Sequence, residues 1–130
     1  IERAGTIEAD AVVKALEQTD RAGVMGRVKF DKGHQVVYGT DLLGSTYTQQ
    51  CREFTLRSQV FTPLELLRQA TSTAAEMMLM DGVIGCVKVG ARADLIVVDG
   101  DPLKDIGLVA ANGQRLSTIV RGGEVIRHSA

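Results

Sequence analysis

The chain has 130 residues, of which 45% are hydrophobic and 24% charged, and its formal net charge is -1. This is the composition of an ordinary globular domain, and the chain is too short for a closed α/β barrel, which takes roughly 200 residues or more. No basic stripe or aromatic platform indicates nucleic-acid binding, and no apolar run approaches the ~20 residues of a membrane span. We therefore expect one compact unit with no nucleic-acid or membrane partner.

The first elements predicted are a helix and a hairpin. Thr6 is a suitable N-cap for a helix over residues 7–19, which has an apolar stripe on one side. Residues 27–30 and 35–38 alternate polar and apolar side chains, and turn residues separate them. This pattern is typical of two half-buried strands in a hairpin.

Residues 39–44 are expected to form a strand-to-loop exit, followed by a helix over residues 46–60 with Tyr47, Cys51 and Phe54 on one face. Both cysteines, Cys51 and Cys86, lack a metal-ligand spacing and are expected to be free, buried thiols.

A strong helix start follows at Thr62. Thr62 can cap, Pro63 suits the first helical position, and Glu65 can close a capping box. The apolar pattern predicts that this helix turns three side chains inward: Leu64, Leu67 and Ala70.

Residues 71–73 predict a break before a helix over residues 74–80, whose methionines are expected to pack in the core: Met77, Met78 and Met80. Short strands are then predicted at residues 85–89 and 93–98.

The last third continues with a turn at residues 99–102 and a short helical stretch within residues 103–111. Residues 116–121 and 124–127 are predicted to form a closing hairpin around a Gly-Gly pair, which favours tight turns. The whole pattern predicts a mixed α+β fold: an N-terminal helix and hairpin, central helices, and a small sheet.

Residues 38–130 resemble the C-terminal part of the amidohydrolase superfamily, near its imidazolonepropionase-like and Xaa-Pro-dipeptidase-like branches. Four blocks carry the resemblance in the family's order: YGTDLLG at 38–44, FTPLELLRQAT at 61–71, IG at 84–85 with VGARADLIVVDGDPL at 89–103, and IVRGGEVI at 119–126. The resemblance implies the end of a barrel's eighth strand, the helices after it, and part of a small β-sandwich. The chain would then be an incomplete amidohydrolase fold.

Residues 1–37 resemble a different family, the periplasmic branched-chain amino-acid binding proteins of ABC transporters. The resemblance rests on IERAG at 1–5, AVVKALE at 11–17 and GVMGRVKFD at 23–31. The seam between the two segments would fall at residues 34–39, and a fusion, a recombination, an assembly error or a deliberately built chimera would explain it.

The amidohydrolase resemblance implies that Asp41 is a catalytic residue and a metal ligand. In the family, the aspartate at this position binds metal and handles the proton of the attacking water. Two other interpretations of Asp41 remain open: a structural loop or helix-capping residue, and a relic without a use. The histidines are His34 and His128, and no His-x-His pair is present.

The family uses zinc or another divalent metal, and a catalytic zinc site needs about three protein ligands. We therefore expect no metal cofactor for this chain alone, and a small-molecule substrate only if other chains complete the site.

By family, the predicted function is metal-dependent hydrolysis of a carbon–nitrogen bond, with no activity expected from this chain alone. The alternatives are an amino-acid-binding fragment and a non-catalytic oligomeric domain. Apolar faces that a barrel would cover predict a homo-oligomer. No signal peptide is recognised, and a cytoplasmic location is slightly favoured.

Overall fold

The structure, a computed structural model, describes residues 36–128 apart from Asp41, Leu43 and the side chains of Ser45 and Thr46. The predicted helix and most of the predicted hairpin in residues 1–35 lie outside this part of the chain. None of the helices in the described part has the length and hydropathy of a transmembrane helix. The elements in order are a 3₁₀ helix, four short α-helices and three strands: η1 (Gly44–Gln49), α2 (Arg52–Arg57), α3 (Pro63–Ala70), α4 (Ser72–Met77), β1 (Leu95–Val98), α5 (Gly107–Ala110), β2 (Leu116–Arg121) and β3 (Glu124–His128).

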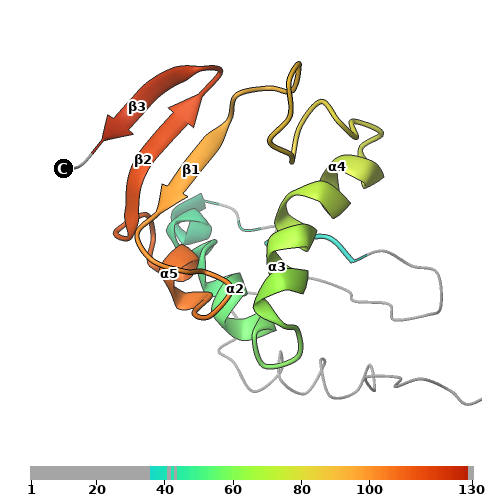
Figure 1. Ribbon diagram of the computed structural model, residues 1–130. Coiled ribbons are helices and arrows are strands. Elements are labelled where there is room, and N and C mark those ends of the chain that lie inside the picture. The colour runs from blue at the N-terminus through green and yellow to red at the C-terminus, as the bar shows by residue number, and fades with distance from the viewer. Residues whose placement is uncertain (1–35, 41, 43, 129–130) are drawn as a thin grey trace, which may run out of the picture.

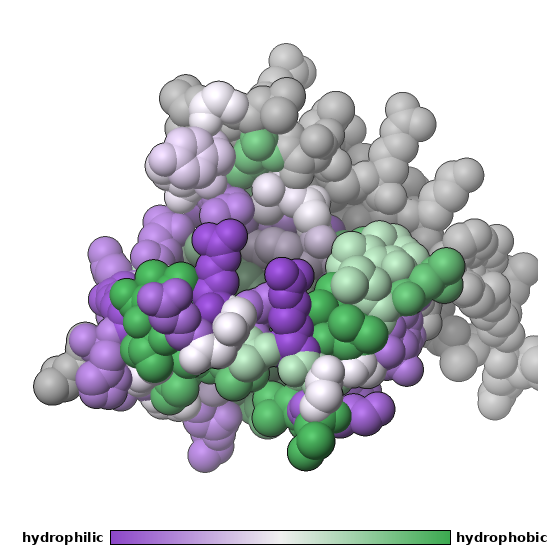
Figure 2. Space-filling model, turned by 90° about the horizontal axis from the view of Figure 1, so that it is seen from above, coloured by the Kyte–Doolittle hydropathy of each residue, from purple (hydrophilic) through white to green (hydrophobic). Residues whose placement is uncertain are grey.

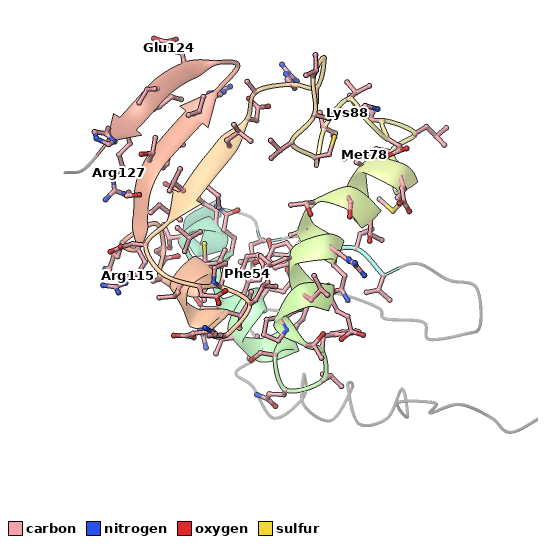
Figure 3. All side chains as sticks on the ribbon, viewed as in Figure 1. Phe54, Met78, Lys88, Arg115, Glu124 and Arg127 are labelled. Atoms are coloured by element: carbon pink, nitrogen blue, oxygen red, sulfur yellow. The ribbon has the colours of Figure 1, made fainter. Side chains whose placement is uncertain are left out.

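The described residues form a helical part and a sheet, and the core lies in the helical part. Helices α2, α3 and α5 surround it, and the three-stranded sheet stands beside them (Figure 1). Four buried apolar side chains make the core cluster: Phe54, Phe61, Leu66 and Ile106. Figure 3 shows Phe54 among these helices. Because no residue of the sheet belongs to this cluster, helix packing dominates the stability of the described part.

Helix α3 begins with the predicted capping box. The Thr62 hydroxyl accepts a hydrogen bond from the Glu65 backbone N–H at 3.4 Å, and the Glu65 carboxylate accepts one from the Thr62 N–H at 2.7 Å. These bonds satisfy backbone donors that a helix start otherwise leaves unpaired. The Thr62 hydroxyl and then its backbone N–H lower the pKa of the Glu65 carboxyl. The helix start inferred from the sequence is confirmed.

The inward face of α3 differs from the prediction. Leu66 is completely buried, whereas Leu64 is 45% exposed. Leu67 and Ala70 are partly buried and pack against the core as expected. Two leucines two positions apart lie about 200° apart around a helix, so both cannot point inward. Packing against α2 and α5 selects Leu66.

The long helix predicted over residues 46–60 is divided into η1 and α2. Residues 45–48 read Ser-Thr-Tyr-Thr, which are poor helix formers, and this favours the tighter 3₁₀ turns at the start. Phe54 is buried, but Tyr47 is 62% exposed, so the predicted apolar face is not continuous. The cysteines are free as expected, although both are half-buried rather than buried.

The sheet is antiparallel with strand order β1-β2-β3, and its closing hairpin is confirmed. Gly122 and Gly123 connect β2 to β3 with φ angles of 58° and 86°. Two successive positive φ angles are the requirement of a tight hairpin turn, which explains the Gly-Gly pair. The predicted strand at residues 93–98 is confirmed as β1, and the helical stretch after it as α5.

Apolar side chains lie on both faces of this sheet. Leu95 and Val125 flank Val120 on one face, and Ile96 lies opposite Ile119 on the other. Ile96, Val125 and several neighbours are about half exposed. On the side seen in Figure 2, hydrophobic side chains lie at the surface between hydrophilic ones. Apolar side chains on both faces are typical of a sheet that is covered on both sides.

The chain between α4 and β1 contradicts two predictions. The strand expected at residues 85–89 is absent, and these residues form an irregular loop. Val87 and Val89 are 88% and 100% exposed, so their apolar alternation has no face to pack against. The helix expected over residues 74–80 begins and ends earlier. Leu79, within the predicted range, has a φ angle of 56°. The methionines of this segment lie largely outside the core, since Met77 is 57% and Met78 51% exposed.

Gly85 fixes this loop against α4, and its replacement gives the first testable prediction. A Cβ atom at Gly85 would lie 2.6 Å from the Thr71 carbonyl oxygen, and the φ angle is +68°. Gly90 has a φ angle of +88° but nothing within 4 Å of its Cβ position. We expect Gly85→Ala to lower the free energy of unfolding by more than about 2 kcal/mol, and Gly90→Ala by about 1 kcal/mol. Urea denaturation measures both, and equal losses would show that the contact with Thr71 is unimportant.

Candidate functional site

The predicted catalytic residue, Asp41, lies outside the described residues, but the backbone that leads to it is described. Tyr38 anchors this segment at two points. Its backbone N–H donates to the Gln69 carbonyl at 3.1 Å, and its hydroxyl donates to the Gln50 carbonyl at 2.6 Å. Val36 and Tyr38 also pack against the core cluster. The segment therefore rests on both η1–α2 and α3.

A buried polar cluster lies behind this segment. Glu53 and Arg57 are 1% and 6% exposed, lie four residues apart on α2, and form an ion pair. Arg57 Nη1 donates to the Gln69 side-chain oxygen at 3.1 Å. Glu53 Oε1 also accepts a long contact of 3.5 Å from the Gly39 backbone N–H. The cluster therefore links α2 and α3 to the residues just before Asp41.

Tyr38 adds an aromatic contact to the cluster. Its ring centroid lies 4.4 Å from that of Phe54, and the Arg57 guanidinium carbon lies 5.8 Å from the Tyr38 centroid. Burial, and next the negative charge of Glu53, raise the pKa of the Tyr38 hydroxyl, while Arg57 acts in the opposite direction. The folded protein therefore holds this hydroxyl protonated.

This shift predicts a pH dependence of stability. Folding raises the pKa of Tyr38 above its usual value. The contribution of Tyr38 to the free energy of unfolding is therefore fully present below about pH 10 and is lost as the pH rises further. We expect the urea midpoint of the wild-type chain to fall above about pH 10, and the fall to be smaller in Tyr38→Phe. Tyr47→Phe, in which the exposed tyrosine is replaced, is the control. A fall that is the same in Tyr38→Phe would contradict the assignment.

Other candidates from the sequence do not form a site in the described part. His128 is exposed, with its Nδ1 2.9 Å from the Thr118 hydroxyl, and His34 lies outside the described residues. Asp94 accepts a hydrogen bond from the Gly122 N–H at 2.6 Å and so contacts the turn of the closing hairpin. Among the described residues, no three His, Cys, Asp or Glu side chains are grouped so that they could hold a metal ion.

One open pocket of about 510 Å³ lies at the tip of the closing hairpin. Charged side chains of both signs line it, and Arg92 lies 3.7 Å from Asp94 there. These two side chains are 65% and 47% exposed, so solvent screens the pair. The pocket lacks the buried polar groups that characterise catalytic centres.

A comparison with protein families resolves the assignment. The sequence profile of the Amidohydrolase family matches residues 10–125. The chain belongs to the amidohydrolase family. Members of this family are generally metal-dependent hydrolases. A comparison with curated proteins gave no match.

Solved amidohydrolase structures share the fold. A prolidase complexed with N-methylphosphonate-L-proline is 44% identical, with a TM-score of 0.68 over 72% of this chain and 23% of that one. An amidohydrolase is 33% identical, with a TM-score of 0.72 over 75% of this chain and 24% of that one. A Xaa-Pro dipeptidase with bound methionine is 21% identical, with a TM-score of 0.64 over 92% and 25%, and shows the fold alone. The chain thus spans about a quarter of the length of these amidohydrolases.

The amidohydrolase match also bears on the first segment. It covers residues 10–37, which is most of the segment that resembles periplasmic binding proteins, and it runs through the seam at residues 34–39. The resemblance to ABC transporter proteins finds no support in any of the comparisons. The division of the chain into residues 1–37 and 38–130 stays a prediction.

The sequence did not predict the buried polar cluster of Glu53, Arg57 and Gln69. A signal was present, because glutamate and arginine four residues apart form an ion pair on one helix face. Such pairs normally lie on the solvent side, and only the three-dimensional contacts with Tyr38 and Gln69 show that this one is buried.

Proposed function

We propose that this chain belongs to a hydrolase of carbon–nitrogen bonds, acting on dipeptides that end in proline, and that Asp41 is its contribution to the catalytic centre. The observation that carries the proposal is the 44% identity to a prolidase complexed with a proline-containing phosphonate. The family match over residues 10–125 supports the same reaction class. The fold shared with a Xaa-Pro dipeptidase agrees with it.

The residues of this chain fit part of a metal site. Asp41 is a suitable oxygen ligand, but a catalytic zinc ion needs about three protein ligands, and the described residues hold no such group. The remaining ligands would lie outside the described residues, in this chain or in other chains. A divalent metal ion would supply Lewis acidity and an acidified water at neutral pH. The part played by Asp41 would be to accept a proton, as a carboxylate general base does.

The test uses the gene product that contains these 130 residues. We expect it to hydrolyse Xaa-Pro dipeptides, and we expect Asp41→Asn to lower kcat by about 100-fold or more, because it removes a general base without changing the side-chain volume. Asp99→Asn changes an exposed aspartate in the turn after β1 and is the matched control.

Full activity in Asp41→Asn would exclude the proposed role. Hydrolysis of other amides, but not of Xaa-Pro dipeptides, would exclude the proposed substrate class. Because the sequence offers too few candidate metal ligands, the 130-residue chain alone is expected to show no turnover.

A further inference from the structure

The stability of α2 does not require a buried polar cluster such as that of Glu53, Arg57 and Gln69. Burying an ion pair removes two charges from water, and the attraction between them often does not exceed this cost. Replacing a buried ion pair by apolar side chains of similar volume often costs little stability, and in some proteins it increases stability. A polar cluster at this place therefore suggests a positioning role.

The contacts of the cluster converge on the residues before Asp41. Gln69 accepts from Arg57 with its side chain and from the Tyr38 N–H with its backbone carbonyl. Glu53 approaches the Gly39 N–H from α2. The Arg57 guanidinium lies near the Tyr38 ring. Two side chains of α2 and one backbone carbonyl of α3, whose own side chain is bonded to Arg57, thus contact residues 38 and 39.

The cluster is also incomplete within the described residues. Glu53 Oε2 is buried and has no hydrogen-bond partner there, and the same is true of Arg57 Nε. An unpaired buried polar group costs about 1–3 kcal/mol, and more when it is charged. A partner outside the described residues would remove this cost.

We propose that the Glu53–Arg57 pair, together with Gln69, positions Asp41 by fixing residues 38 and 39, which lead to it. The inference rests on the proposed function, since it gives the cluster a task at that centre. Glu53 and Arg57 are positioning residues and do not touch the substrate. Catalytic groups need to be held close to their productive geometry, and a misplacement of about 1 Å can cost about 100-fold in rate.

Two variants test the proposal in the gene product that contains this chain. Glu53→Gln removes the negative charge at constant volume. The double variant Glu53→Met/Arg57→Leu removes both charges, and we expect it to remain folded even if the single variant does not. Glu65→Gln, which changes the exposed capping-box carboxylate of α3, is the matched control.

The first measurement is amide hydrogen exchange of peptides 36–42 and 63–70. We expect exchange in 36–42 to rise about tenfold or more in the double variant and to stay within about twofold in 63–70, because the loss of the cluster opens the segment locally. Unchanged exchange in 36–42, or an equal rise in both peptides, would overturn the proposal.

The second measurement is a kinetic cycle with Asp41→Asn. We expect the double variant to lower kcat by about 10- to 100-fold with little change in KM when Asp41 is present, and to have no further effect in Asp41→Asn. An equal effect in both backgrounds would overturn the positioning role. If the wild type hydrolyses no dipeptide, the proposed function fails, and the exchange result still decides whether the cluster fixes the segment.

Discussion

Leu66→Ala is expected to lower the free energy of unfolding by about 2–5 kcal/mol, the usual cost of removing a fully buried leucine side chain. Leu66 has no exposed surface and lies in the core cluster with Phe54, Phe61 and Ile106. A small domain has a total stability of about 5–15 kcal/mol, so this change removes a large fraction of it. Chemical denaturation monitored by circular dichroism measures the loss.

The matched control is Leu64→Ala in the same helix. Leu64 is 45% exposed, and we expect its replacement to cost less than about 1 kcal/mol. Both variants make the same chemical change in α3, so helix propensity cancels in the comparison. If Leu64→Ala were the more destabilising variant, the sequence-based orientation of α3 would be right and the observed one wrong.

Glu53→Ala is expected to cost about 3–5 kcal/mol, because it leaves the Arg57 charge buried without its partner. Arg57→Ala should cost a similar amount for the complementary reason. The double variant Glu53→Met/Arg57→Leu should be less destabilising than either single change, since it leaves no unpaired charge. The wild type, the two single variants and Glu53→Ala/Arg57→Ala form a double-mutant cycle, and their denaturation gives the coupling between the two side chains.

An exposed pair provides the comparison. Lys104 lies 3.5 Å from Asp101, and the Lys104 side chain is 85% exposed. We expect Lys104→Ala to cost less than about 1 kcal/mol, as is usual for surface ion pairs. Additive costs for Glu53 and Arg57 would contradict a buried pair, because the two side chains would then act independently.

The features that the sequence predicted correctly depend on local chemistry. The capping box needs only the four residues from Thr62 to Glu65, about one helical turn, and nothing from the rest of the chain. The Gly122-Gly123 turn requires positive φ angles, which favour glycine. Each of these signals lies within a few residues of the structure that it specifies.

The features that the sequence missed depend on distant contacts. Leu66 rather than Leu64 is buried because it packs in the core cluster with residues of α2 and α5. Glu53 is buried together with Arg57, which bonds to Gln69 of α3. Residues 85–89 have the apolar alternation of a strand, but no neighbouring strand pairs with them in the described part. The burial of the polar cluster could not be predicted, because charged pairs with this spacing usually face solvent. The position of Asp41 lies outside the described residues, and its role stays a prediction.

The most direct test of this account is the divalent metal content of the gene product that contains these residues, compared with its Asp41→Asn and Asp99→Asn variants. The account predicts near-stoichiometric metal in the wild type and in Asp99→Asn, and a clear loss of metal in Asp41→Asn, because removing a ligand lowers affinity. Equal metal content in all three proteins, or no metal in the wild type, would contradict the claim that this chain contributes Asp41 to a metal-dependent hydrolase centre.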